Sequence, residues 1–398
     1  MKRIYMDHSA TTQLSQKAFD AMLPYFREEY GNPSAVYDYG QVAKNAVEKS
    51  RNRVSKAIGA LPTELYFTSG GTESNNWVIR SVCRMKKDKG RHIISTTIEH
   101  NAVKKTLEQM EEDGFEVTYL NPDKYGHITP EQLEEAIRED TILITIMLAN
   151  NVVGSVFAIK ELAAVARKHK VWFHTDAVQA VGHIPVNARQ LGVDFLSISA
   201  HKFNGPKGVG ALFCKLPNRL KPLLTGGGQE KEGRSSTENV PAIVGMTEAL
   251  EENVLNLTSN MEYLNDLMNY MNEEILKIPG VYQTGDPVNR LPGFCSFVIE
   301  DISHSVLLVN KLNEKGISVS SGSACSASSK EASHVLLALG YNDQLAGCSL
   351  RITLGMDNTR EDVEIAIKAV RQAISELRSE QVSRAPRLEG RVSEIHGQ

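Results

Sequence analysis

Two side chains with complementary chemistry follow two short apolar runs near the middle of the chain. Residues 171–173 lead into Asp176, and residues 195–198 lead into Lys202. If both runs are buried strands of a parallel sheet, the carboxylate and the amine lie at the same edge of that sheet. Taken singly, an Asp in this place is also typical of a helix cap and a Lys of a solvated charge.

As a pair, Asp176 and Lys202 fit one kind of organic cofactor. A lysine amine can form a Schiff base with an aldehyde, and an anion can keep a pyridine nitrogen protonated so that the ring withdraws electrons. Pyridoxal phosphate needs both groups. The sequence therefore predicts a pyridoxal 5'-phosphate site with Lys202 as the attachment point.

A phosphate site is predicted where residues 68–75 (TSGGTESN) follow an apolar run and open a helical pattern. Gly71 lets the backbone approach an anion closely, and Thr72 adds a hydroxyl beside the amides of the first helical turn. The alternative interpretation is an ordinary capped turn between a strand and a helix.

His100 follows another apolar run and is expected at the same sheet edge. An imidazole there can lie against a cofactor ring and move a proton. The alternative is that His100 only caps the helix that begins at Asn101.

Cys325 lies in a run of small residues from Ser320 to Ser329 that has no bulky apolar side chain to anchor it. Such a segment is predicted to be a mobile loop, and a cysteine on it to be a nucleophile rather than a packing residue. Arg351 follows on a predicted strand, where a planar guanidinium suits a carboxylate ligand. Its alternative interpretation is a structural ion pair.

Apolar runs alternate with amphipathic helical segments through the first two thirds of the chain, which is typical of an α/β fold. The strand-like runs are residues 65–67, 92–94, 117–120, 142–147, 171–173, 195–198 and 209–213. We therefore expect a mostly parallel seven-stranded sheet flanked by helices, plus a smaller α/β C-terminal domain. The predicted large domain is 13–258, and the small domain is 1–12 with 259–378. The boundary between them falls within a long helical pattern at 240–278, and the last predicted helix is 360–377. Residues 320–330 are the expected cysteine loop, and 379–398 a flexible tail.

Composition narrows the class of protein. The chain has 398 residues, a net charge of -4 and 5 cysteines. So small a charge gives no basis for direct binding of nucleic acid or of an anionic membrane surface. The scattered cysteines form no CxxC pair, and no apolar stretch approaches the length of a membrane span. We expect a cytoplasmic enzyme without a resident metal.

The motifs as a set resemble the cysteine desulfurases of the NifS/IscS type, in the class V aminotransferase group of fold-type I pyridoxal phosphate enzymes. The resemblance runs from Asp7 to about residue 377, and the loop is similar to the long-loop branch rather than to the SufS branch. It is carried by residues 7–12 (DHSATT), 31–34 (GNPS), 68–75 (TSGGTESN), 176–179 (DAVQ), 199–202 (SAHK), 234–239 (RSSTEN) and 321–326 (SGSACS).

The resemblance implies a role for each matching position. Lys202 holds the cofactor as a Schiff base, Asp176 pairs with its ring nitrogen, Gln179 contacts the ring hydroxyl and His100 stacks on the ring. Further implied roles are phosphate binding by Gly71, Thr72, Ser199 and His201, with Thr237 supplied by the neighbouring subunit of a homodimer, and carboxylate binding by Asn151 and Arg351.

The activity that the resemblance implies converts L-cysteine to L-alanine and leaves the sulfur on Cys325 as a persulfide. The persulfide would pass to an acceptor such as an iron–sulfur scaffold protein or a tRNA-thiolation factor, and Cys325 can contact an iron–sulfur cluster transiently. The alternatives are a selenocysteine lyase, a cysteine C–S lyase, or a weakly active sulfur-relay scaffold.

Several positions depart from the family pattern. Val152 and Phe157 replace a Glu and a Gln, and Asn204 stands where an aromatic residue or His is common. Glu232 begins a pair that is normally Gly-Leu, and Ser236 replaces a Gly. None of these changes removes a predicted cofactor ligand.

Overall fold

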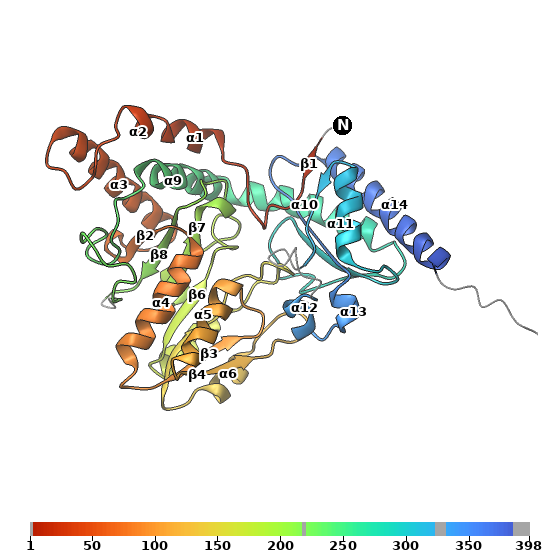
Figure 1. Cartoon of the computed structure of the whole chain (residues 1–398), viewed down its shortest axis with the longest axis horizontal. Coiled ribbons are helices and arrows are strands. Elements are labelled where there is room, and N and C mark those ends of the chain that lie inside the picture. The colour runs from red at the N-terminus through yellow and green to blue at the C-terminus, as the bar shows by residue number, and fades with distance from the viewer. Residues whose placement is uncertain (1–2, 217–219, 323–331, 385–398) are drawn as a thin grey trace, which may run out of the picture.

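The computed structural model describes residues 3–216, 220–322 and 332–384 (Figure 1). Its centre is a seven-stranded sheet in the order β2-β8-β7-β6-β5-β3-β4. Only β8 runs antiparallel to its neighbours, so the predicted mostly parallel sheet is confirmed. Its strands are β2 (Leu65–Thr68), β3 (His92–Thr96), β4 (Glu116–Leu120), β5 (Thr141–Thr145), β6 (Trp172–Asp176), β7 (Phe195–Ser199) and β8 (Gly210–Cys214).

Both faces of the sheet are covered because successive strand side chains point to opposite sides. Ile93, Leu143 and Phe195 pack with α4 (Gly71–Lys86) and α5 (Asn101–Glu112). The next residue on each strand packs on the other side, among helices α3 (Asp38–Ala57), α7 (Ile159–Lys168) and α9 (Val240–Leu255). The strands contain runs of consecutive apolar residues because both faces of the sheet are buried.

A second hydrophobic core lies at the other end of the molecule, around a three-stranded antiparallel sheet in the order β12-β10-β9 (Figure 1). The core draws on Ile4 and Met6 from the N-terminus and otherwise on residues between Leu264 and Leu377. The predicted division at residue 258 has no direct test and stays a prediction. The elements of this part are β1 (Ile4–Tyr5), α10 (Leu257–Ile275), β9 (Val281–Gln283), β10 (Phe294–Ile299), α11 (Ser305–Glu314), β11 (Ile317–Ser318), β12 (Ser349–Thr353) and α14 (Arg360–Arg384).

The remaining helices are short. They are α1 (Gln16–Met22), α2 (Pro24–Arg27), α6 (Pro130–Ala136), α8 (Ala188–Leu191), α12 (His334–Ala338) and α13 (Asp343–Ala346), with 3₁₀ turns η1 (Pro62–Glu64) and η2 (Ala200–Lys202).

Three predicted boundaries differ from the structure. The single helix expected over 240–278 is two helices, α9 and α10, which meet at Asn256, where ψ is 11° and the regular helix is interrupted. Helix α14 continues past the predicted end at Leu377 to Arg384, because no Gly or Pro occurs before Pro386. Ser320 and Ser321 are buried rather than part of an exposed loop, since Ser320 pairs with Arg351 through the backbone.

Within the described ranges, none of the helices has both the length and the apolar character needed to span a lipid bilayer.

Candidate active site

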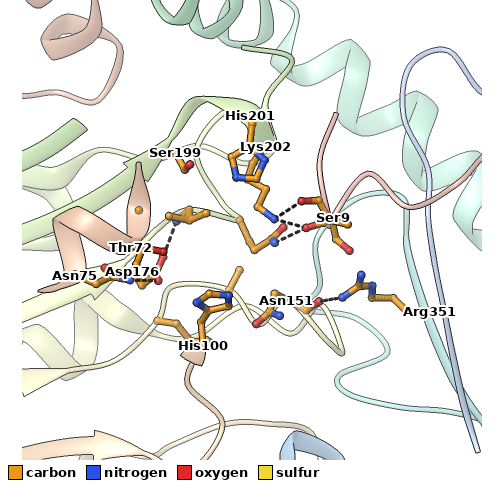
Figure 2. Close-up of a pocket in the computed structure, with 16 residues that line it drawn as sticks. Ser9, Thr72, Asn75, His100, Asn151, Asp176, Ser199, His201, Lys202 and Arg351 are labelled. Carbon is orange, nitrogen blue, oxygen red and sulfur yellow. Dashed lines mark hydrogen bonds between the residues drawn. The ribbon is translucent and has the colours of Figure 1, made fainter. Parts of the chain in front are cut away.

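A cavity of about 350 Å³ lies at the carboxyl ends of the sheet strands (Figure 2). Most of the predicted site residues meet there although they come from distant segments. The lining includes Gly71, Thr72, His100, Asn151, Asp176, Gln179, Ser199, His201, Lys202 and Arg351. These residues therefore line one cavity, and their roles in a common site stay predictions.

Asp176 ends strand β6, and two donors hold its carboxylate. Asn75 Nδ2 donates to Oδ2 over 2.6 Å, and the Val178 amide donates to Oδ1 over 3.0 Å. Together these two hydrogen bonds fix the direction of the carboxylate. The Asn75 Oδ1 atom is buried and has no hydrogen-bond partner, so the Asn75 amide keeps acceptor capacity beside the cavity.

Lys202 lies in η2, directly after β7, and its amine points into the cavity (Figure 2). Nζ donates to the carbonyl oxygens of Ser9 and Ala10, the latter over 2.9 Å. Gln179 Nε2 donates to the same Ser9 oxygen over 2.9 Å. The N-terminal segment thus crosses the site and holds the amine in place.

The N-terminus of α4 forms one wall of the cavity at Gly71 and Thr72. A Cβ atom added to Gly71 would lie 2.5 Å from Val178 Cγ2, so only glycine fits between the helix and the Asp176 turn. Ser199 and His201 line the same cavity. Burial, followed by the charges of Lys202 and Lys207, lowers the pKa of His201 to about 4, so the imidazole is neutral at physiological pH.

His100 caps helix α5, as one of its two interpretations predicted, and its role toward a cofactor stays a prediction. Its Nδ1 accepts from the Ala102 amide over 3.1 Å and caps α5. The imidazole also lines the cavity on the side opposite Lys202 (Figure 2). The cap fixes the ring orientation and leaves Nε2 directed away from the helix amides.

Arg351 on β12 is only 2% exposed and is bound on two sides. Nη1 donates to the Asn151 carbonyl over 2.8 Å, and Nη2 donates to Asp7 Oδ1 over 2.8 Å. The structural ion pair that was the alternative interpretation is therefore present. Arg351 also lines the cavity, and its predicted role in binding a carboxylate stays a prediction.

The apolar replacements near Asn151 are explained by the core. Val152 and Phe157 are each 4% exposed and pack in the main hydrophobic cluster. Asn150 holds the turn together, because its Oδ1 accepts hydrogen bonds from the amides of Val152 and Val153 over 2.8 and 3.0 Å. The turn that presents Asn151 thus needs no carboxylate at position 152.

The other departures share a backbone feature. Asn204, Glu232 and Ser236 have φ values of 62, 66 and 130°. Positive φ favours glycine, and at Ser236 the family has one. At each of these positions a side chain therefore occupies a backbone conformation that favours glycine.

One predicted site residue within the described ranges does not line this cavity. Thr237 lines a separate cavity of about 200 Å³ beside Ser236 and Glu238, which leaves its predicted role toward a neighbouring subunit untested. Cys325 lies outside the described residues. The other four cysteines are buried. Burial raises the pKa of Cys83, Cys214 and Cys295 to about 12 and also raises the pKa of Cys348.

Four residues that form hydrogen bonds with Arg351, Lys202 or Asp176 were not predicted as site residues. They are Asp7, Ser9, Ala10 and Asn75. All four fall within two motifs of the sequence analysis, 7–12, which was used only for the resemblance, and 68–75, in which only Gly71 and Thr72 were predicted to bind a ligand. Asn75 also lies one helical turn after Gly71, a spacing that places it on the same face of α4.

Comparison with known proteins agrees with this geometry. The family model for aminotransferase class-V matches residues 4–365. A cysteine desulfurase IscS of Methanosarcina thermophila is 46% identical over 378 residues, covering 95% of this chain and 93% of its own. The mitochondrial cysteine desulfurase of Saccharomyces cerevisiae is 40% identical over 94% of this chain and 76% of its own.

Solved structures give the same result. A NifS-like protein superposes with a TM-score of 0.90 at 36% identity and covers 94% of this chain and 100% of its own. SspA in complex with cysteine superposes with a TM-score of 0.79 at 34% identity, over 89% of this chain and 99% of its own. The chain therefore belongs to the class V aminotransferase family and, within it, to the cysteine desulfurases of the IscS type.

Proposed function

We propose that the cavity holds pyridoxal 5'-phosphate and that the protein uses it to convert L-cysteine to L-alanine. The observation that carries this proposal is that an amine, Lys202, and a doubly hydrogen-bonded carboxylate, Asp176, line one cavity of about 350 Å³. Cysteine desulfurase activity of the relatives and the cysteine in the SspA complex support the substrate.

The donor set fits each part of the cofactor. The first turn of α4 with Thr72, Ser199 and neutral His201 offers uncharged donors suited to a phosphate. Asp176 would pair with a protonated ring nitrogen, and Gln179, which lines the same cavity, would contact the ring hydroxyl. His100 lies across the cavity from Lys202, where it would stack on the ring. Gly71 leaves room that any side chain would fill.

When bound, pyridoxal phosphate supplies an aldehyde for the Lys202 amine and an electron-poor ring that stabilises negative charge at the substrate Cα. Arg351 binds the carboxylate of L-cysteine and Asn151 orients it. Lys202 would act as the general base that removes the Cα proton. The carbonyls of Ser9 and Ala10 hold that amine at the edge of the cavity.

We assign the sulfur transfer to Cys325. Its thiolate attacks the substrate sulfur, an S–S bond forms, and the Cβ–S bond breaks with its electron pair left on the carbon skeleton, which takes up protons and leaves as alanine. The four described cysteines support this choice, because their burial and raised pKa values keep them as thiols. Ser320, at the start of the predicted loop, pairs with Arg351, so the loop begins beside the carboxylate site.

The remaining parts of the proposal concern partners. The persulfide passes to an acceptor protein such as an iron–sulfur scaffold or a tRNA-thiolation factor, in the cytoplasm. The enzyme acts as a homodimer in which Thr237 of each subunit reaches the phosphate of the other. A position of Thr237 away from its own cavity is compatible with this arrangement.

The test is product analysis of the purified, cofactor-loaded protein with L-cysteine and dithiothreitol. We expect alanine and sulfide in equal amounts. Pyruvate in place of alanine would instead identify a C–S lyase. If neither alanine nor pyruvate is formed, the proposal is overturned.

Variants assign the residues. Cys325→Ala is expected to keep the visible absorbance of the bound cofactor and to lose sulfide production, whereas Lys202→Ala is expected to lose that absorbance. Cys214→Ala, which removes a buried thiol away from the cavity, is the matched control and should retain both properties. Sulfide release by Cys325→Ala at the wild-type rate would show that another group takes the sulfur.

A further inference from the structure

Three successive backbone carbonyls around the active-site lysine are each held by a side chain from a different segment. Thr12 Oγ1 donates to the His201 carbonyl over 2.9 Å, and Asn253 Nδ2 donates to the Phe203 carbonyl over 3.0 Å. Between them, His183 Nε2 lies 2.8 Å from the carbonyl oxygen of Lys202. These groups come from the N-terminal segment, from α9 and from the turn that follows Gln179.

The contact at Lys202 determines the tautomer of His183. A carbonyl oxygen only accepts hydrogen bonds, so Nε2 must carry the proton. Burial lowers the pKa of His183. The hydrogen bond to the Lys202 carbonyl acts in the opposite direction, the nearby charges of His8 and Lys202 add to the lowering, and the net pKa is below the ordinary value. His183 is therefore a neutral donor that adds no positive charge beside the lysine amine.

The hydrogen bond to the Lys202 carbonyl matters because it fixes the backbone from which a flexible side chain extends. The Lys202 amine is joined to its Cα by four methylene groups, and its far end is held by Ser9 and Ala10. Holding the carbonyl fixes the direction in which the side chain leaves the η2 turn. An error of about 1 Å in the position of a reacting group can lower a rate by about 100-fold.

We propose that His183 is a positioning residue for Lys202, acting through a hydrogen bond from Nε2 to the lysine carbonyl. This inference rests on the proposed function, since it assigns Lys202 as the base. His183 touches neither the substrate nor the cofactor space, because it is not part of the cavity lining.

The test compares three variants by steady-state kinetics of alanine formation, expressed per cofactor-loaded subunit. His183→Leu removes the donor, and we expect kcat to fall about tenfold while KM for L-cysteine changes by less than about twofold. His183→Gln places an amide nitrogen near the position of Nε2 and should recover most of the loss. His183→Asn carries the same donor on a shorter side chain and should behave like the Leu variant.

A purely structural role for His183 predicts a different result. It would lower the melting temperature and the cofactor content but leave kcat per loaded subunit unchanged. Equal kcat values for the wild type and His183→Leu, or equal loss in the Gln and Asn variants, would overturn the inference. The Gln and Asn pair decides the question even if the Leu variant does not fold.

The control is His304→Leu. His304 is also partly buried and bonded to the backbone, through the Val306 amide, but does not line the cavity. Its kcat should equal that of the wild type. A wild-type protein that forms no alanine would refute the proposed function, which is a separate outcome from the failure of the His183 variants.

Discussion

Arg351 and Asp7 are separated by 344 positions and form an ion pair of 2.8 Å in the wall of the cavity. Arg351 is almost fully buried, and a buried guanidinium needs a carboxylate or several hydrogen bonds to remain there. Asp7 and the Asn151 carbonyl supply them. The arginine is therefore already oriented before a substrate carboxylate arrives.

Replacement of this arginine by lysine tests its role in binding. Arg351→Lys keeps the charge but loses the planar set of donors, so it cannot serve Asp7, Asn151 and a substrate carboxylate together. We expect KM for L-cysteine to rise about tenfold, with the visible absorbance of the cofactor unchanged. Arg360→Lys, at a half-exposed helix position, is the control and should leave KM unaltered. An unchanged KM in Arg351→Lys would contradict carboxylate binding at this residue.

Asn75 is expected to contribute to cofactor affinity through Asp176. Asn75→Ala removes a 2.6 Å bond to a charged carboxylate, and such bonds contribute about 1.5–3 kcal/mol. The apparent Kd for pyridoxal phosphate, from absorbance titration of the apoprotein, should rise about tenfold or more. The control is Asn52→Ala, at an exposed position of α3, which removes a hydrogen bond from the side-chain amide to the Glu48 carbonyl and should not change Kd. Equal affinities for Asn75→Ala and the wild type would mean that Asp176 needs no support from α4.

Glu99 makes the stability of the protein depend on pH. Its side chain is 1% exposed, and burial raises its pKa to about 8. The unfolded chain loses this proton near pH 4.3, so between about pH 4.3 and 8 the folded state binds more protons and stability falls as pH rises. Glu99→Gln lacks this proton equilibrium and should gain about 1 kcal/mol per pH unit relative to the wild type over that window.

Denaturant unfolding at about pH 5.5, 6.5 and 7.5 measures the Glu99 effect. Exposed Glu262→Gln is the control, and its stability should follow the wild type at each pH. A constant difference between Glu99→Gln and the wild type would show that Glu99 is ionised in the folded protein.

Ser236 carries backbone strain that glycine would relieve. Its φ of 130° lies in a region that residues with a Cβ rarely adopt, at a cost of about 1 kcal/mol or more. Ser236→Gly should therefore raise the free energy of unfolding by about 1 kcal/mol. Ser259→Gly in the exposed part of α10 should instead lower it by about 0.5 kcal/mol, since helical backbone disfavours glycine. Thermal unfolding of both variants gives the comparison, and destabilisation by Ser236→Gly would show that its side chain has a role that outweighs the strain.

Much of the site could be predicted because it follows strand ends. Asp176, Lys202 and His100 come after apolar runs, and parallel strands in an α/β sheet end at a common edge. The helix boundaries were less predictable. Asn256 interrupts a pattern that remains helical on both sides, and nothing in the local sequence marks that break as a change of helix.

The sequence by itself determined the type of fold and predicted a cofactor and the residues that would hold it, because periodicity and short motifs are local properties of the chain. Only the tertiary structure decided which groups support those residues. Asp7 beside Arg351, Asn75 beneath Asp176 and His183 against the Lys202 carbonyl join segments that lie far apart in sequence. Such contacts depend on the order of strands in the sheet and on how the terminal segments pack across it, and neither is written in any local pattern.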